Sequence, residues 1–130
     1  MAKTITIGAS ATAEERVQFE NTLTAHDHSL PSLFATPDML RLMEIAALRA
    51  LKPFCEEGEI SVGASVEIEH RAPVGINDVV RAEAVVDSVH EGFIRFKVKA
   101  TSGKTIIGKG TVTRVIVNSK EFLAKHDILA

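Results

Sequence analysis

The stretch that most constrains the fold is residues 34–51 (FATPDMLRLMEIAALRAL), which predicts a helix that is apolar around most of its circumference. Thr36 is a good N-cap residue, and Pro37 suits the first helical position because its missing N–H is not needed there. Asp38 places negative charge at the positive end of the helix dipole. Pro53 predicts the end of the helix, since proline cannot continue it. A helix of this kind needs cover on nearly every side.

Glu44 is the exception on the apolar side of this helix. At 100° per residue, the charged residues of the helix lie within about 80° of one another, and Glu44 lies about 60° beyond the edge of that stripe. A carboxylate there is costly to bury unless it has a partner. Two interpretations stay open: Glu44 turns toward Arg41 and remains hydrated, or it meets a charged or hydrogen-bonding group from elsewhere in the chain.

The composition is that of an ordinary globular chain, with 130 residues, 45% of them hydrophobic and 25% charged, and a net charge of −2. This length suits one domain, residues 1–130, with one core. Nucleic acid is not the expected partner, because the chain has no strongly basic segment and neither Trp nor Tyr. No signal peptide or bilayer-spanning stretch is recognisable, so we expect a cytoplasmic protein without a membrane partner. Cys55, the only cysteine, is expected to be a small buried thiol.

The segments outside the helix predict strands. Residues 4–7 are predicted as a short strand, 8–13 as a loose segment, and 15–23 as a half-buried strand. Alternating polarity predicts four more strands, over residues 59–71, 78–89, 93–101 and 105–117. Residues 118–130 are predicted as a short helical or frayed tail.

One helix is the only cover available for the inner faces of these strands. We therefore predict an α+β hotdog fold, in which a curved antiparallel β-sheet wraps around one long central α-helix. An exposed edge strand predicts that two copies associate by extending the sheet. In the strand after the helix, alternation places five residues on the inner face: Val62, Ala64, Val66, Ile68 and His70. In the last strand, Gly108 and Gly110 leave room for another backbone or a ligand.

Three side chains supply the parts of a hydrolytic site if this strand packs on the helix. His70 would then approach Glu44, and Thr36 would lie at the start of the helix. A hydroxyl, an imidazole and a carboxylate can together deprotonate a water molecule or a hydroxyl group. Each has a structural alternative, because Thr36 can be only a helix cap and His70 only a core histidine bonded to a backbone carbonyl.

Three runs of the sequence, FATPDMLRLMEIAALRAL, EGEISVGASVEIEHRAP and GKGTVTRVIVNSKEFL, resemble the hotdog thioesterases related to fluoroacetyl-CoA thioesterase. The resemblance covers roughly residues 17–123. In that family a threonine caps the central helix, a glutamate follows eight residues later and a histidine lies on the next strand; Thr36, Glu44 and His70 occupy these positions. The resemblance implies that these three residues are catalytic.

The resemblance also implies a function. It implies an acyl-CoA thioesterase, a hydrolase of small or medium acyl thioesters of coenzyme A, that works as a homodimer or as a tetramer of such dimers with active sites at the subunit interface. Gly63 matches the family's glycine near the thioester carbonyl, and Ala64 and Phe34 are assigned to substrate binding with it. Ala64 departs from the family's common threonine. Residues 26–33 do not copy the lid of the fluoroacetate-specific enzyme, so fluorine selectivity is not carried over.

No cofactor or metal is expected beyond the coenzyme A of the substrate. His26 and His28 flank Asp27 in a polar loop, which is more typical of solvent-exposed histidines than of metal ligands. The alternative function is that of a non-catalytic hotdog protein, which binds an acyl thioester or another small ligand without hydrolysing it.

Overall fold

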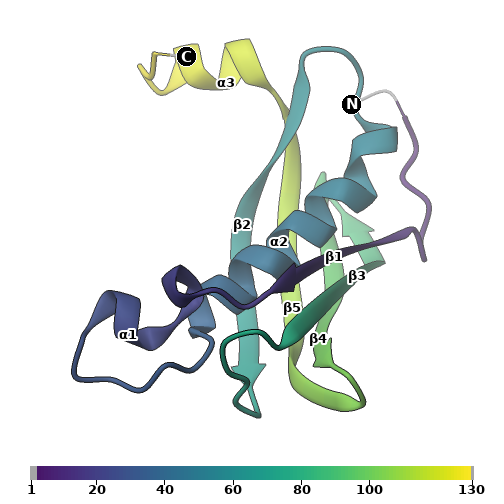
Figure 1. Ribbon diagram of the computed structural model, residues 1–130. Helices are drawn as coiled ribbons and strands as arrows, with labels where there is room; N and C mark the ends of the chain where they lie inside the picture. The colour runs from purple at the N-terminus through teal and green to yellow at the C-terminus, as the bar shows by residue number, and fades with distance from the viewer. Residues whose placement is uncertain (1–2, 130) are drawn as a thin grey trace.

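The computed structural model of the protein describes residues 3–129 (Figure 1). Its elements in chain order are β1 (Ser10–Arg16), η1 (Phe19–Asn21), α1 (Leu23–His26), α2 (Thr36–Leu51), η2 (Lys52–Phe54), β2 (Glu59–His70), β3 (Val79–His90), β4 (Phe93–Ser102), β5 (Thr105–Asn118) and α3 (Ser119–Lys125). The strands form one antiparallel sheet in the order β1-β3-β4-β5-β2. The sheet curls around α2, which confirms the predicted α+β hotdog fold.

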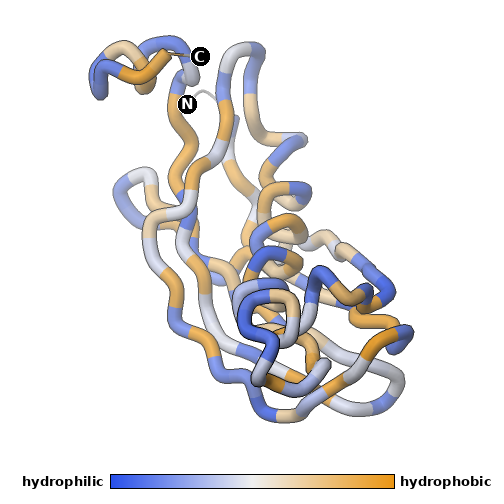
Figure 2. The backbone as a smooth tube through the Cα atoms, turned by 60° about the vertical axis from the view of Figure 1, so that its left-hand side comes forward, coloured by the Kyte–Doolittle hydropathy of each residue, from blue (hydrophilic) through white to orange (hydrophobic). Residues whose placement is uncertain are grey.

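Helix α2 buries one face against the sheet. It packs mainly on β1 and β3, whose inner positions carry small side chains: Ala13 pairs with Ala82, and both are buried. Small residues on both surfaces allow the helix and the sheet to approach closely. Figure 2 shows the alternation of hydrophobic and hydrophilic residues along the strands that this packing requires. The buried residues of the helix are Met39, Leu42, Met43, Ala46, Ala47, Ala50 and Leu51.

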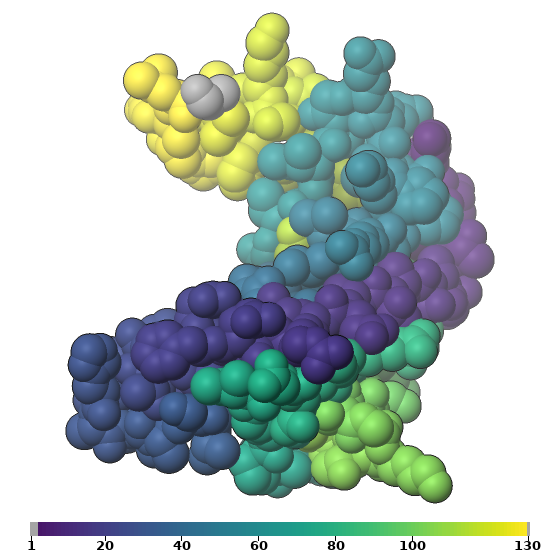
Figure 3. Space-filling model, in the orientation of Figure 1, coloured from purple at the N-terminus to yellow at the C-terminus, as the bar shows by residue number. Residues whose placement is uncertain are grey.

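The opposite side of α2 is not covered within one chain. Leu48 is 44% exposed, and Leu40 and Ile45 are only partly buried. Figure 3 shows that this face of the molecule is hollowed between the C-terminal segment and the segment that precedes α2. The predicted cover on nearly every side of the helix is therefore missing in the single chain. Apolar side chains left open next to such a hollow indicate a surface that meets another molecule.

The N-terminal strand lies earlier than predicted. The predicted strand over residues 15–23 and the short strand over residues 4–7 were wrong: the strand is β1, Ser10–Arg16, in the segment predicted to be loose. Phe19–Asn21 instead form the short 3-10 helix η1, and Leu23–His26 form the short helix α1. The prediction failed because it gave weight to large apolar residues. β1 instead carries Ala11 and Ala13, whose small side chains fit the narrow space beneath the helix.

A β-bulge at Ala64 changes which residues of β2 face inward. Gly63 pairs with Arg114 of β5, and Ser65 pairs with the preceding residue, Thr113, so Ala64 has no partner in the ladder. Before the bulge the buried position is Ser61 rather than Val62, and after it the inward positions are Ile68 and His70, as predicted. The predicted single inner face from Val62 to His70 was wrong because alternation assumes an uninterrupted ladder.

Two glycines of β5 allow close approach, as predicted. A Cβ at Gly108 would lie 2.5 Å from Met39 Sδ of the helix, and a Cβ at Gly110 would lie 2.6 Å from Ile68 Cα in β2 and closer still to the Glu67 carbonyl oxygen. Glycine is needed at both positions because any side chain would push β2 or α2 away.

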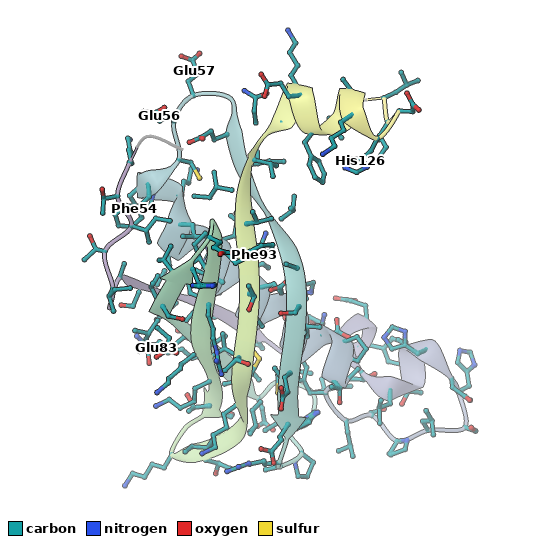
Figure 4. All side chains as sticks on the ribbon, turned by 180° about the vertical axis from the view of Figure 1, so that it is seen from behind. Phe54, Glu56, Glu57, Glu83, Phe93 and His126 are labelled. Atoms are coloured by element: carbon teal, nitrogen blue, oxygen red, sulfur yellow. The ribbon has the colours of Figure 1, made fainter. Side chains whose placement is uncertain are left out.

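The predicted helical tail is α3, which Asn118 caps by accepting a hydrogen bond from the Glu121 backbone N–H at 3.0 Å. In Figure 4, His126 lies just past this helix, and its ring packs against Phe122 with centroids 4.8 Å apart. The same view shows Glu56 and Glu57 on the turn before β2, where a solvated connection is expected. Among the described residues no helix has the length and apolar character needed to cross a membrane.

Candidate active site

Thr36 and His70 form a hydrogen-bonded pair at the start of α2. Thr36 is the first residue of the helix, and its Oγ1 lies 2.7 Å from His70 Nδ1, at the end of β2. Thr36 is not the N-cap: the cap position is Ala35, and the helix start has no side-chain cap. The predicted capping role of Thr36 was therefore wrong, and its hydroxyl is committed to the imidazole instead. His70 is likewise bonded to a side chain and not to a backbone carbonyl.

A depression of about 300 Å³ opens beside this pair, lined by Leu23, Leu33, Phe34, Thr36, His70, Arg71, Ala72 and Pro73. Its apolar wall comes from the segment between η1 and α2. Phe34 is buried, and its backbone N–H donates to the Val74 carbonyl at 2.8 Å, which ties that wall to the connection after β2. A hydroxyl and an imidazole at the edge of a small apolar depression can bind a short acyl group and polarise its carbonyl.

Glu44 is paired with a buried arginine. Arg114 of β5 is only 6% exposed, and its Nη1 donates to Glu44 Oε2 at 3.0 Å. The same guanidinium donates from Nε to Ser61 Oγ at 3.0 Å and from Nη2 to the Ser61 carbonyl at 2.8 Å. The hydrated alternative for Glu44 was therefore wrong, because Arg41 pairs with Glu15 and approaches Asp38. Glu44 of α2 therefore pairs with a cation of β5, as a partly buried carboxylate requires.

Glu44 and the Thr36–His70 pair line different depressions of the chain. Glu44 and Arg114 line a depression of about 410 Å³ with Pro37, Leu40, Arg41, Ile45 and Leu48, on the uncovered face of α2. Thr36 and Glu44 are eight residues apart, which is about 12 Å along a helix axis. The predicted meeting of Glu44 with His70 therefore does not occur within the single chain.

Both parts of the site contain a buried polar atom without a partner. Glu44 Oε1 and His70 Nε2 are each shielded from solvent and make no hydrogen bond with the described residues. Buried polar atoms are nearly always hydrogen-bonded in folded proteins. We therefore infer that Glu44 Oε1 and His70 Nε2 bind polar groups from a substrate, a water molecule or a second chain.

The remaining predicted site residues differ in their surroundings. Gly63 lies against Glu44: a Cβ there would be 2.9 Å from Glu44 Oε2. Phe34 lines the depression beside Thr36, as described above. Ala64, the bulge residue, is exposed and lines neither depression.

Sequence reasoning missed Arg114 and Ser61, the partners that hold Glu44. A signal for Arg114 was present, because it shares the inward parity of Val112 in the last strand and so places a charge on the core side. That charge could have been matched to the unexplained carboxylate of Glu44. No comparable signal existed for Ser61, whose inward direction depends on the bulge at Ala64.

Cys55 follows η2 at the other end of α2, far from Thr36 in the chain. Partial burial raises the pKa of its thiol, and the negative charge of Glu59 adds to this shift while Lys3 opposes it. A raised pKa lowers the thiolate fraction at neutral pH, which does not favour a nucleophile. The thiol is partly rather than fully buried, in contrast to the predicted buried position.

Comparison with known proteins adds a family to this geometry. The model of the family described as "FlK: Fluoroacetyl-CoA-specific thioesterase" matches residues 17–120 of the chain. The fluoroacetyl-CoA thioesterase of Streptantibioticus cattleyicolor is 38% identical over 97 residues, which are 73% of this chain and 68% of that protein.

Solved structures agree with the sequence matches. A structure of the fluoroacetyl-CoA thioesterase FlK is similar to this chain with a TM-score of 0.88 and 29% identity, covering 95% of this chain and 96% of that one. A thioesterase superfamily member from Thermus thermophilus has a TM-score of 0.88 and 28% identity, covering 95% and 92%. Variants of FlK have been solved in complex with fluoroacetate, with acetyl-CoA, and with fluoroacetate and CoA.

Proposed function

Because this chain belongs to the FlK family of fluoroacetyl-CoA-specific thioesterases and is a thioester hydrolase, we propose that it cleaves short acyl-CoA thioesters with Thr36, Glu44 and His70. The observation that carries the proposal is the pair of buried atoms without a partner, Glu44 Oε1 and His70 Nε2. Each belongs to a residue at a family position, and each is free to bond a reacting group.

The chemistry assigns one task to each part of the site. Glu44 Oε1 takes a proton from a water molecule while the water oxygen attacks the carbonyl carbon of the thioester. Thr36, held by His70, faces the carbonyl oxygen with the backbone N–H groups of the helix start, which stabilise the negative charge that develops there. The tetrahedral intermediate then collapses: the C–S bond breaks, the sulfur of coenzyme A takes up the proton, and the free acid remains.

A single chain does not place these groups around one carbonyl, because Thr36 and Glu44 lie about 12 Å apart along α2. Thr36, Leu40 and Glu44 follow one another at four-residue spacing along one side of the helix. In an antiparallel pair of helices with a two-fold axis near Leu40, Thr36 of one copy lies opposite the partner's Glu44. We therefore propose a homodimer in which each site combines the Thr36–His70 pair of one copy with the glutamate of the other.

Two surface features support this dimer. β2 pairs only with β5 among the described strands, so its other edge can extend the sheet into a second copy. Apolar side chains lie along this edge and on the uncovered helix: Ile60 is 42% exposed, Val66 is 45% exposed and Leu48 is 44% exposed. A second copy on this surface would bury all three and fill the hollow of Figure 3.

The first experiment measures turnover. Acetyl-CoA, fluoroacetyl-CoA, butyryl-CoA and benzoyl-CoA are incubated with the enzyme, and the released coenzyme A is followed with a thiol reagent. We expect turnover of the short acyl groups, and a loss of kcat of about 10²- to 10⁴-fold in Glu44→Gln and His70→Ala. Wild-type turnover in both variants would exclude the assigned site. An acyl group found on Thr36 by mass spectrometry would replace direct attack by a two-step route.

The second experiment tests the composite site. Thr36→Ala and Glu44→Gln chains, each with strongly reduced activity alone, are unfolded together and refolded as a mixture. A mixed dimer holds one intact site if the residues come from different copies, so activity returns to about a quarter of the wild-type value for random pairing. A site built within one chain would give no recovery, because every chain in the mixture carries a defect.

A further inference from the structure

Arg114 is a buried cation that a stability argument does not explain. It is 6% exposed and spans three elements, since it extends from β5 and donates both to Ser61 of β2 and to Glu44 of α2. Buried ion pairs are often replaceable by apolar residues without loss of stability, because desolvation of the charges offsets their attraction. We therefore look for the role of Arg114 in the chemistry of the Glu44 carboxylate, which it binds.

The two oxygens of Glu44 are in different states. Oε2 accepts from Arg114 Nη1 at 3.0 Å and lies against the backbone of Gly63, where a Cβ would be 2.9 Å away. Oε1 is buried and has no partner among the described residues. The bond to Arg114 thus occupies Oε2. Oε1 is held in a fixed direction and can accept a proton from a reacting group.

The guanidinium itself is fixed from behind. Nε and Nη2 both bind Ser61, one through the hydroxyl and one through the backbone carbonyl, so the planar group cannot rotate about its own axis. Nη1 therefore directs one of its N–H groups at Glu44 in a fixed direction. A chain of fixed groups runs from the backbone of β2 through Arg114 to the carboxylate on the helix.

We propose that Arg114 is the positioning residue of Glu44: it holds Oε2 so that Oε1 faces the attacking water. This inference rests on the proposed function, in which Glu44 is the general base. In this proposal the effect of Arg114 on turnover passes through Glu44, beside which it lines the depression on the uncovered face of α2. Groups that act on a reacting atom lose rate steeply when misplaced, by about 10²-fold for 1 Å.

The experiment is a double-mutant cycle on kcat with acetyl-CoA, using Arg114→Met, Glu44→Gln and the double variant. We expect Arg114→Met to lower kcat by about 10- to 100-fold with KM changed less than about twofold. In the Glu44→Gln background the same substitution should lower kcat by less than about twofold, because the residue that Arg114 positions is already disabled. An equal loss in both backgrounds would show that Arg114 acts on its own and would overturn the proposal.

Three further variants separate positioning from folding. Arg114→Lys keeps a buried cation but cannot hold Ser61 and Glu44 together, so its kcat should lie between those of the wild type and Arg114→Met. Ser61→Ala leaves the bond to the backbone carbonyl in place and should lower kcat by no more than about threefold. Arg95→Met, on the exposed side of β4, is the matched control and should leave kcat and the melting temperature unchanged.

The outcomes also separate this inference from the proposed function. Should Arg114→Met not fold, as judged by circular dichroism, Arg114→Lys takes its place in the cycle with the same expectation of no further loss in the Glu44→Gln background. A Glu44→Gln enzyme with wild-type kcat refutes the general base and Arg114's role with it. A Glu44→Gln enzyme without turnover, next to a fully active Arg114→Met enzyme, refutes the role of Arg114 alone.

Discussion

The substitution Gly63→Ala tests how strictly the position of Glu44 is set. A Cβ at this position would lie 2.9 Å from Glu44 Oε2, 3.9 Å from Arg114 Nη1 and 4.0 Å from Glu44 Cδ. Only the first of these contacts is too short, so the clash falls on one oxygen. An ordinary contact begins at about 3.4 Å, so the carboxylate must move by about 0.5 Å.

This movement has a predictable direction and cost. Oε2 cannot yield freely, because Arg114 holds it at 3.0 Å, so the carboxylate moves as a unit and carries Oε1 with it. If a misplacement of 1 Å costs about 10²-fold in rate, a displacement of half that size costs about tenfold in kcat.

The assay is steady-state hydrolysis of acetyl-CoA by Gly63→Ala, with the melting temperature measured in parallel. Gly75→Ala is the control, because a Cβ there meets only the Ser32 carbonyl oxygen at 4.0 Å, an ordinary contact. Loss of kcat in Gly63→Ala together with an unchanged Gly75→Ala enzyme supports the reasoning. Unchanged kcat in both would refute it, since the position of Glu44 would then not matter for turnover.

Two further predictions concern stability and thiol chemistry. Gly110→Ala should lower the free energy of unfolding by about 1–3 kcal/mol in urea titrations, because its methyl group would be forced into Glu67 and Ile68 of β2; unchanged stability would show that β2 shifts at no cost. The pKa of the Cys55 thiol is raised by burial, so less thiolate exists at any given pH and iodoacetamide should label it more slowly at pH 8 than it labels glutathione; equal or faster labelling would contradict this.

The sequence was most informative where a local rule and the tertiary environment agree. The long helix, the four strands after it and the close approach at Gly108 and Gly110 follow from apolar periodicity and from glycine placement. The match of Thr36, Glu44 and His70 to a family spacing also came from sequence, and their catalytic roles stay predictions. Periodicity works for these elements because each has one buried face and a regular ladder.

The sequence was least informative where a tertiary constraint decides. β1 carries alanines that allow the helix to pack closely on the strand, but alanine has a low strand propensity and gives no strong strand signal. The hydroxyl of Thr36 bonds His70 and does not cap the helix, which depends on where β2 ends. The 12 Å between Thr36 and Glu44 follows from helix geometry alone and could have been inferred at the outset.

The bulge at Ala64 has a consequence for how this strand can vary. One extra residue puts the two halves of β2 out of phase, so that odd-numbered residues face the helix in the first half and even-numbered residues face it in the second. Deleting Ala64 would restore a regular ladder and would turn either Ser61 and Gly63 or Ile68 and His70 toward solvent. The single unpaired residue therefore lets Ser61 and Gly63 face Glu44 while His70 of the same strand faces Thr36. An insertion or deletion between the two halves would turn one of these sets away from the helix.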